Sequence, residues 1–116
     1  MADVSEQFVV RGGVATARHL RAGTRMSING HGFSVQTAPG LSPADLARGG
    51  RYPNRQISVA TVNQLIAAGV SVRWPTPGAG ACHGTVLVPE HASDDLFDLL
   101  AALFTPETNP FPMFEN

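Results

Sequence analysis

Two histidine–glycine pairs are the first candidates for proton-transfer chemistry. In His83-Gly84-Thr85 the imidazole and the hydroxyl stand two residues apart, so an extended segment points both to one face. This spacing is typical of elements that grip phosphodiesters, where two such elements supply one imidazole as base and another as acid. In the second candidate, His31-Gly32-Phe33-Ser34, the hydroxyl comes one residue further on. We take His31 and His83 as candidate catalytic residues; the alternative is two strand-edge histidines that make structural hydrogen bonds.

An arginine precedes the first pair of glycines in the chain. Arg11-Gly12-Gly13 lies between a β-like segment and a predicted helix, where backbone amides and a guanidinium can together hold a phosphate. A tight strand-to-helix turn explains the same glycines without any ligand. Arg11 is therefore a candidate phosphate ligand.

The charges are distributed unevenly along the chain. All eight basic residues are arginines; they fall between Arg11 and Arg73 with a single acid, Asp45, which gives this span a balance of +7. Residues 74–116 carry six acids and no basic residue. The asymmetry predicts an anionic ligand on the first part and a neutralising or partner-facing role for the second, unless the charges interleave and cancel on the folded surface. The absence of lysine beside many Ala, Gly, Arg and Pro residues indicates a GC-rich coding bias and a bacterial source.

Other motifs that carry chemistry are absent or poorly placed. Cys82 is the one cysteine, which favours a reducing compartment, and in an extended segment it points away from the side chain of His83. The histidines lack zinc-ligand spacing, and the glycine-rich residues 75–84 connect two β-like segments instead of opening a helix as a phosphate-binding fingerprint must. We expect no metal, no cofactor and a hairpin at 75–84.

Without a signal-peptide pattern or a bilayer-length apolar run, we expect a cytoplasmic protein that does not engage membranes.

Helix signals mark four segments. A helix over residues 15–22 ends at a glycine, and Ser42 and Pro43 are the N-cap and first residue of a second helix. A third helix begins at Thr61. The last starts at Ser93, and its apolar residues follow helical spacing, so we expect it to pack on the core.

Five β-like runs lie between these helices, at residues 7–11, 32–37, 56–60, 70–74 and 84–88. Three of them alternate apolar and polar residues, as in Phe33 and Val35 against Ser34 and Gln36. Alternation is typical of a sheet with one face against helices and one wet face. The sequence predicts an α+β fold, a two-layer sandwich with about four to five short strands in a mixed sheet and about four helices mainly on one face.

The end of the chain differs from the rest in composition. Residues 1–105 are expected to form a single α+β domain. Residues 106–116 are rich in proline and aromatic residues, and we expect an irregular tail packed on the domain or on a partner.

The polar side of the predicted strands supplies the candidate substrate-binding residues. Uncharged donors beside arginine suit a ribose, a phosphate or a peptide edge, unless the face is simply solvated. The candidates are Arg11, Ser34, Gln36, Gln56, Ser58, Arg73 and Thr85.

Two functions remain open. The first is a small bacterial effector- or toxin-like domain that binds a phosphate-bearing substrate, NAD+ or RNA, through an Arg-rich polar sheet face without a metal. For ADP-ribosyl transfer a carboxylate near the ribose is needed, and Glu90 is the acid close to a strand end. The second is a non-catalytic interaction module, such as an antitoxin, an immunity protein or an adaptor, which engages a protein partner or another copy through residues 93–116. The sequence does not decide whether the chain is an enzyme.

Overall fold

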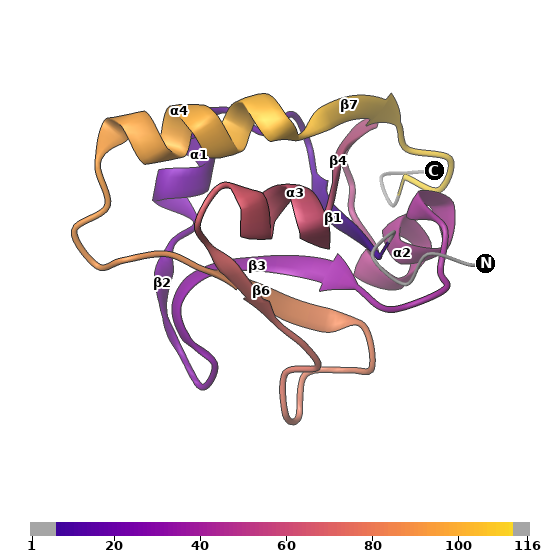
Figure 1. Ribbon diagram of the computed structural model, residues 1–116. Coiled ribbons are helices and arrows are strands. Elements are labelled where there is room, and N and C mark those ends of the chain that lie inside the picture. The colour runs from indigo at the N-terminus through magenta and orange to yellow at the C-terminus, as the bar shows by residue number, and fades with distance from the viewer. Residues whose placement is uncertain (1–6, 113–116) are drawn as a thin grey trace.

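An antiparallel β-sheet runs through the part of the molecule that the computed structural model describes, residues 7–112 (Figure 1). Its strand order is β5-β6-β3-β1-β4-β7, and β2 pairs with β3 beside this path. Every strand pair is antiparallel. The strands are β1 (Phe8–Gly12), β2 (Arg25–Ser27), β3 (Gly30–Thr37), β4 (Gln56–Thr61), β5 (Ser71–Arg73), β6 (His83–Leu87) and β7 (Thr105–Thr108).

Four helices in the same residues confirm the expected segments. They are α1 (Ala17–Ala22), α2 (Pro43–Gly50), α3 (Val62–Ala67) and α4 (Asp94–Leu103). Each begins after a serine or threonine whose hydroxyl accepts a hydrogen bond from the backbone N–H three residues on, which satisfies one of the free amides of the first turn. No helix among the described residues is long and apolar enough to cross a membrane.

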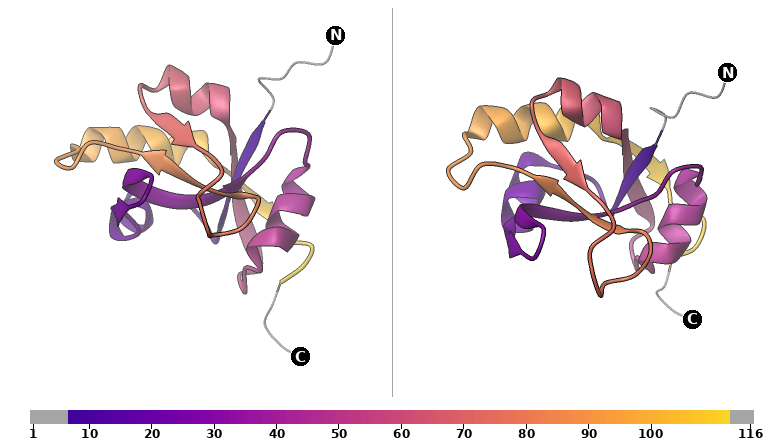
Figure 2. Two further views of the ribbon diagram at one scale, coloured as in Figure 1. Left: turned by 90° about the horizontal axis from the view of Figure 1, so that it is seen from below. Right: turned by 60° about the horizontal axis from the view of Figure 1, so that its bottom comes forward.

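The helices cover both faces of the sheet unequally. Helices α1, α3 and α4 pack over one core, and α2 packs over a second core on the opposite face; Figure 2 shows α2 set apart from the other three. Strand β1 contacts both cores, because Val9 lies in the first core and Val10 in the second, and neither is exposed.

The α+β class predicted from the sequence is confirmed. The sheet, however, has seven strands instead of four to five and is antiparallel instead of mixed.

Two strands were missed, each for a local reason. Ser27 pairs with Gly30, so Ile28 and Asn29 form a two-residue hairpin turn between β2 and β3, and β2 itself is only three residues long and exposed throughout, so it shows no alternation. At the other end, β7 pairs with β4 although it contains Pro106. The expectation of an irregular segment here is wrong, because an edge strand tolerates a proline that a central strand would not.

The second helix layer also reverses the expected orientation of β4. Ile57 and Val59 face the α2 core, so the alternate residue Ser58 points toward the layer of three helices and is 1% exposed. Ser58 is therefore not part of a wet face, contrary to the prediction. Its hydroxyl accepts from the backbone N–H of Ala15 at 2.7 Å and donates to the carbonyl of Gly13 at 2.6 Å, which satisfies both groups in the strand-to-helix turn.

Replacing Ser58 by Ala should lower the free energy of unfolding by about 1–3 kcal/mol, because it leaves a backbone donor and an acceptor without partners. Denaturant unfolding of Ser58→Ala measures this loss. Ser71→Ala, on an exposed position of β5, is the control and should change stability by less than about 0.5 kcal/mol. Equal effects of the two substitutions would contradict the buried role of Ser58.

Candidate functional site

The sheet divides between β1 and β3. These strands pair only at Val9 with Thr37 and Val10 with Gln36. Beyond Val10, β1 continues along β4 as far as Gly12, while β3 continues along β6. Extending the register would place Arg11 opposite Val35, yet no such pair forms. We call this divergence the fork.

The Arg11 side chain occupies the fork. Its guanidinium donates from Nη1 to the Ser34 carbonyl at 2.6 Å and lies over the Phe33 ring, 5.1 Å from the ring centroid. A side-chain donor thus takes the place of the missing strand-to-strand hydrogen bond. Arg11 is half-buried, and burial lowers the pKa of its guanidinium, an effect that the nearby Tyr52 opposes. Arg11 nevertheless stays charged at physiological pH, because an arginine side chain in a protein is effectively always protonated.

Tyr52 closes the fork from the side of α2. Its hydroxyl donates to the carbonyl of Val10 at 3.2 Å. Two glycines make room for the ring: a Cβ at Gly12 would lie 2.6 Å from Tyr52 Cδ1, and a Cβ at Gly50 would lie 2.5 Å from Cε2. Burial raises the pKa of Tyr52 to about 12, with the positive charge of Arg11 acting in the opposite direction. Tyr52 is therefore a neutral hydroxyl, and not a base, at physiological pH.

The end of the chain holds the segment that carries Tyr52. Asn109 follows β7 and is 3% exposed. Its amide donates to the carbonyls of Tyr52 at 3.3 Å and Asn54 at 2.8 Å, and its backbone N–H donates to the carbonyl of Arg55 at 2.8 Å. Residues 105–109 are thus built into the fold and fix one wall of the fork.

The fork opens into a hollow of about 310 Å³. Its wall carries a guanidinium, an imidazole, hydroxyls and side-chain amides, and no carboxylate. Besides the half-buried Arg11, the lining includes Gly12, Ser34, Gln36, Gly50, Tyr52, Asn54 and His83.

Four of the predicted site residues meet at this hollow. Arg11 comes from β1, Ser34 and Gln36 from β3, and His83 from β6, where it pairs with Gln36. Because β3 alternates, Ser34 and Gln36 share the face opposite the buried Phe33. The roles that the sequence suggested for these four residues remain predictions, but their convergence is a feature of the fold.

The other predicted residues lie elsewhere. Thr85 is 2% exposed and accepts a hydrogen bond from Asn29, and Ser58 is buried as described above. Gln56 and Arg73 are exposed on β4 and β5 and do not line the hollow. The expected continuous polar face is therefore interrupted, because loop and helix residues cover part of it.

His31 lies in a separate, smaller hollow of about 130 Å³ that Glu90 also lines. Its Nδ1 is 3.0 Å from the carbonyl of Val88. The two candidate histidines are thus not a pair acting on one substrate, and Glu90 does not reach the ribose position expected for ADP-ribosyl transfer beside Arg11.

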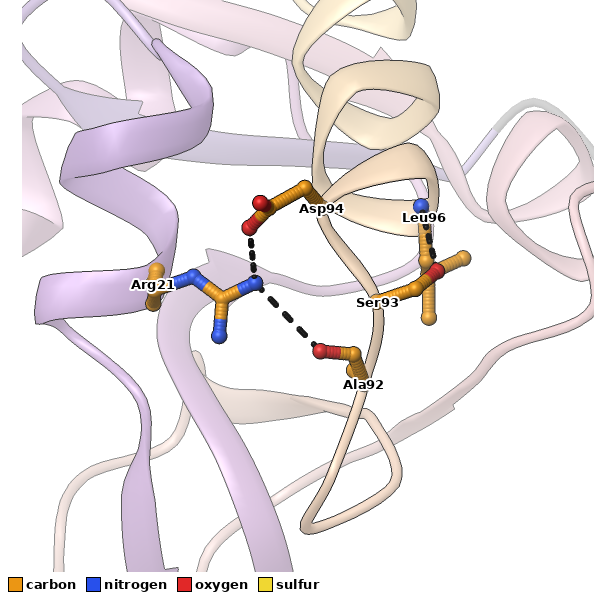
Figure 3. A network of polar contacts seen from close by, with 5 residues as sticks. All are labelled: Arg21, Ala92, Ser93, Asp94 and Leu96. Atoms are coloured by element: carbon orange, nitrogen blue, oxygen red, sulfur yellow. Dashed lines mark hydrogen bonds and ion pairs between the residues drawn. The ribbon is translucent and has the colours of Figure 1, made fainter.

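The arginines of the basic segment are likewise dispersed. Figure 3 shows Arg21 of α1 bound to the start of α4, where its Nη2 contacts Asp94 Oδ1 at 2.5 Å and the Ala92 carbonyl at 3.3 Å. Arg48 lies over the Phe111 ring, 4.3 Å from its centroid. Of the eight arginines, all within the described residues, Arg11 is the one that lines the fork hollow.

Sequence reasoning missed Tyr52, Asn54 and Gly50. The chain between α2 and β4 offers no motif, since its residues act through Gly12 and Asn109, which are distant in sequence. One signal was available: Tyr52 is the only tyrosine in the chain, and it closely follows two consecutive glycines.

The hollow supplies positive charge and hydrogen-bond donors. Among residues 7–112 no group of three or more His, Cys, Asp or Glu side chains is placed to hold a metal ion. Comparison of the chain with protein-family models, with curated proteins and with solved structures finds no match.

The single tyrosine makes its environment directly measurable. Phenolate absorbance should appear with a midpoint near pH 12 in the folded protein, against about 10 for free tyrosine. Because unfolded Tyr52 loses its proton first, stability should fall as the pH rises from about 10 toward 12. A midpoint near 10 in the folded protein would contradict the buried position of the ring.

Two adjacent glycines of α2 provide a matched test of how the ring is seated. Gly50→Ala should displace Tyr52 and move its titration midpoint back toward about 10, because the new methyl group overlaps the ring. Gly49→Ala is the control: its Cβ would meet only Gln36 Oε1, at an ordinary 3.6 Å, so the midpoint should not move. Identical titration curves for the two variants would show that Gly50 does not set the ring position.

Proposed function

We propose that the chain binds a phosphate ester of nucleotide size in the fork hollow, with the phosphate on Arg11. The observation that carries this proposal is a half-buried guanidinium that lines a hollow without a carboxylate partner. Arg21 has Asp94 as its ion-pair partner, whereas no acid among the described residues lines the hollow beside Arg11. Partial burial of a cation without a counter-ion carries a desolvation cost, and an anionic ligand would offset that cost.

The other groups of the hollow suit the rest of such a ligand. Ser34 offers a hydroxyl, and Gln36 and Asn54 offer amides that both donate and accept, as ribose hydroxyls and base edges require. A volume of about 310 Å³ is at the lower end of the range for small-molecule sites. These features support binding of one nucleotide unit.

A small ligand is favoured over RNA. A protein that follows a polynucleotide needs a row of cations along several phosphates. Here Arg21 is paired with Asp94, Arg48 is stacked on Phe111, and Arg73 is exposed on β5 and does not line the hollow. One guanidinium in one hollow fits one phosphate.

Ligand binding is also favoured over the cleavage reactions considered from the sequence. RNA cleavage by two histidines needs both at one phosphate, and His31 is in another hollow. ADP-ribosyl transfer needs a carboxylate near the ribose, and its candidate, Glu90, lines that other hollow. The fork thus supports recognition of a phosphate ester and supplies no complete acid–base pair.

The alternative of a protein-interaction module has less support. It depended on residues 93–116, but β7 is hydrogen-bonded to β4, and Asn109 is buried against residues 52–55. Residues 105–109 thus already serve the fold of their own domain.

Calorimetric titration with inorganic phosphate and AMP tests the proposal. Arg11→Ala should weaken both affinities by roughly 10- to 100-fold, because a hydrogen bond to a charged group contributes about 1.5–3 kcal/mol. Arg73→Ala removes an exposed arginine from β5 and serves as the control, with affinity changed less than about twofold.

Two results would overturn this function. One is the absence of any Arg11-dependent binding of phosphate or AMP. The other is tight binding of single-stranded RNA with a steep salt dependence that Arg73→Ala weakens as much as Arg11→Ala, since this would indicate a polynucleotide surface in place of a single phosphate site.

A further inference from the structure

His83 ends a chain of side-chain hydrogen bonds that leads away from the hollow. Its Nδ1 lies 2.8 Å from Thr76 Oγ1, and Asn29 Nδ2 donates to the same oxygen at 2.7 Å. The Asn29 amide also donates to Thr85 Oγ1 at 3.3 Å. Asn29, Thr76 and Thr85 are 8%, 7% and 2% exposed, so this chain is largely closed to water. We call Asn29, Thr76 and His83 the relay.

The direction of the relay follows from counting hydrogens. An amide nitrogen only donates, so Thr76 Oγ1 accepts from Asn29 and still has its own hydrogen to donate. Among the described residues, the other side-chain atom that hydrogen-bonds to this oxygen is His83 Nδ1. A buried hydroxyl hydrogen needs an acceptor. His83 Nδ1 is an acceptor only if the hydrogen of the neutral ring is on Nε2.

Backbone contacts hold the relay in place. The backbone N–H of Thr76 donates to the carbonyl of His83 at 2.8 Å, across the loop between β5 and β6. On the other side His83 pairs with Gln36 of β3. The imidazole is therefore held at Nδ1 by the relay, and His83 also lines the fork hollow.

We propose that Asn29 and Thr76 fix neutral His83 as the Nε2–H tautomer, which makes His83 a hydrogen-bond donor in the fork hollow instead of a general base. The tautomer is a property of the free protein. Its use, donation to a bound phosphate oxygen beside the guanidinium of Arg11, rests on the proposed function. Asn29 and Thr76 are then positioning residues for the ligand, although neither lines the hollow.

Long-range proton–nitrogen NMR of the free protein tests the tautomer directly, because the two ring nitrogens give different shifts in the two forms. A His83→Ala variant identifies the His83 signals among those of the four histidines. At a pH where the ring is neutral, the expected result is a hydrogen on Nε2. A hydrogen on Nδ1 would overturn the relay, whatever the ligand experiments show.

Asn29→Asp should reverse the tautomer. A carboxylate accepts and does not donate, so the Thr76 hydroxyl would turn its hydrogen to the new carboxylate, and Thr76 Oγ1 would accept from His83 Nδ1–H. The same NMR spectrum then shows the hydrogen on Nδ1. If Asn29→Asp folds and His83 keeps its hydrogen on Nε2, the relay does not set the tautomer.

Thr76 provides a matched pair that links the relay to the ligand. Thr76→Ser keeps the hydroxyl and should keep both the Nε2–H signal and the phosphate affinity within about twofold. Thr76→Val keeps the shape but removes the hydroxyl, and should weaken phosphate binding by roughly 3- to 10-fold. Equal affinities for the two variants, with the Nε2–H tautomer present in the wild type, would overturn the use of the relay in binding. Absence of phosphate binding by the wild type would overturn the proposed function alone.

Discussion

Strands β1 and β3 share two residue pairs and then separate, and the carbonyl groups at that separation must find other donors. Arg11 donates to the carbonyl of Ser34, and Tyr52 donates to the carbonyl of Val10. Both side chains are therefore structural parts of the sheet. The donor that reaches across the fork is the long side chain of an arginine on β1. The same requirement therefore places a guanidinium in the lining of the hollow.

Because Arg11 is held at the separation of β1 and β3, its guanidinium lies apart from the described acids of the chain. Asp94 and Asp95 lie in the first turn of α4, where they stabilise the helix N-terminus, and Asp94 also pairs with Arg21. The hollow is lined instead by amides, hydroxyls and the imidazole of His83. Within residues 7–112, the guanidinium of Arg11 thus has no carboxylate beside it in the hollow. We infer a binding site whose specificity comes from the fixed orientation of its donors, including the ring of His83.

Local patterns in the sequence predicted the helices and five of the strands, because caps such as Ser42 and alternation such as that of β3 act within a few residues. The prediction failed where distant residues decide. The sequence of β4 does not reveal that α2 covers its second face, so Ser58 was placed on the wrong side. Arg11, Ser34, Gln36 and His83 were found as polar residues in or beside strands. Tyr52 was not, because its position depends on glycines in two other elements.

The position of an anion in the fork is the most direct test of this account. Crystals grown with tungstate, a heavy phosphate-shaped anion, would locate it by anomalous scattering. We expect one strong site within hydrogen-bonding distance of both the Arg11 guanidinium and the His83 ring. An empty fork with tungstate held instead at exposed arginines such as Arg73 would contradict it.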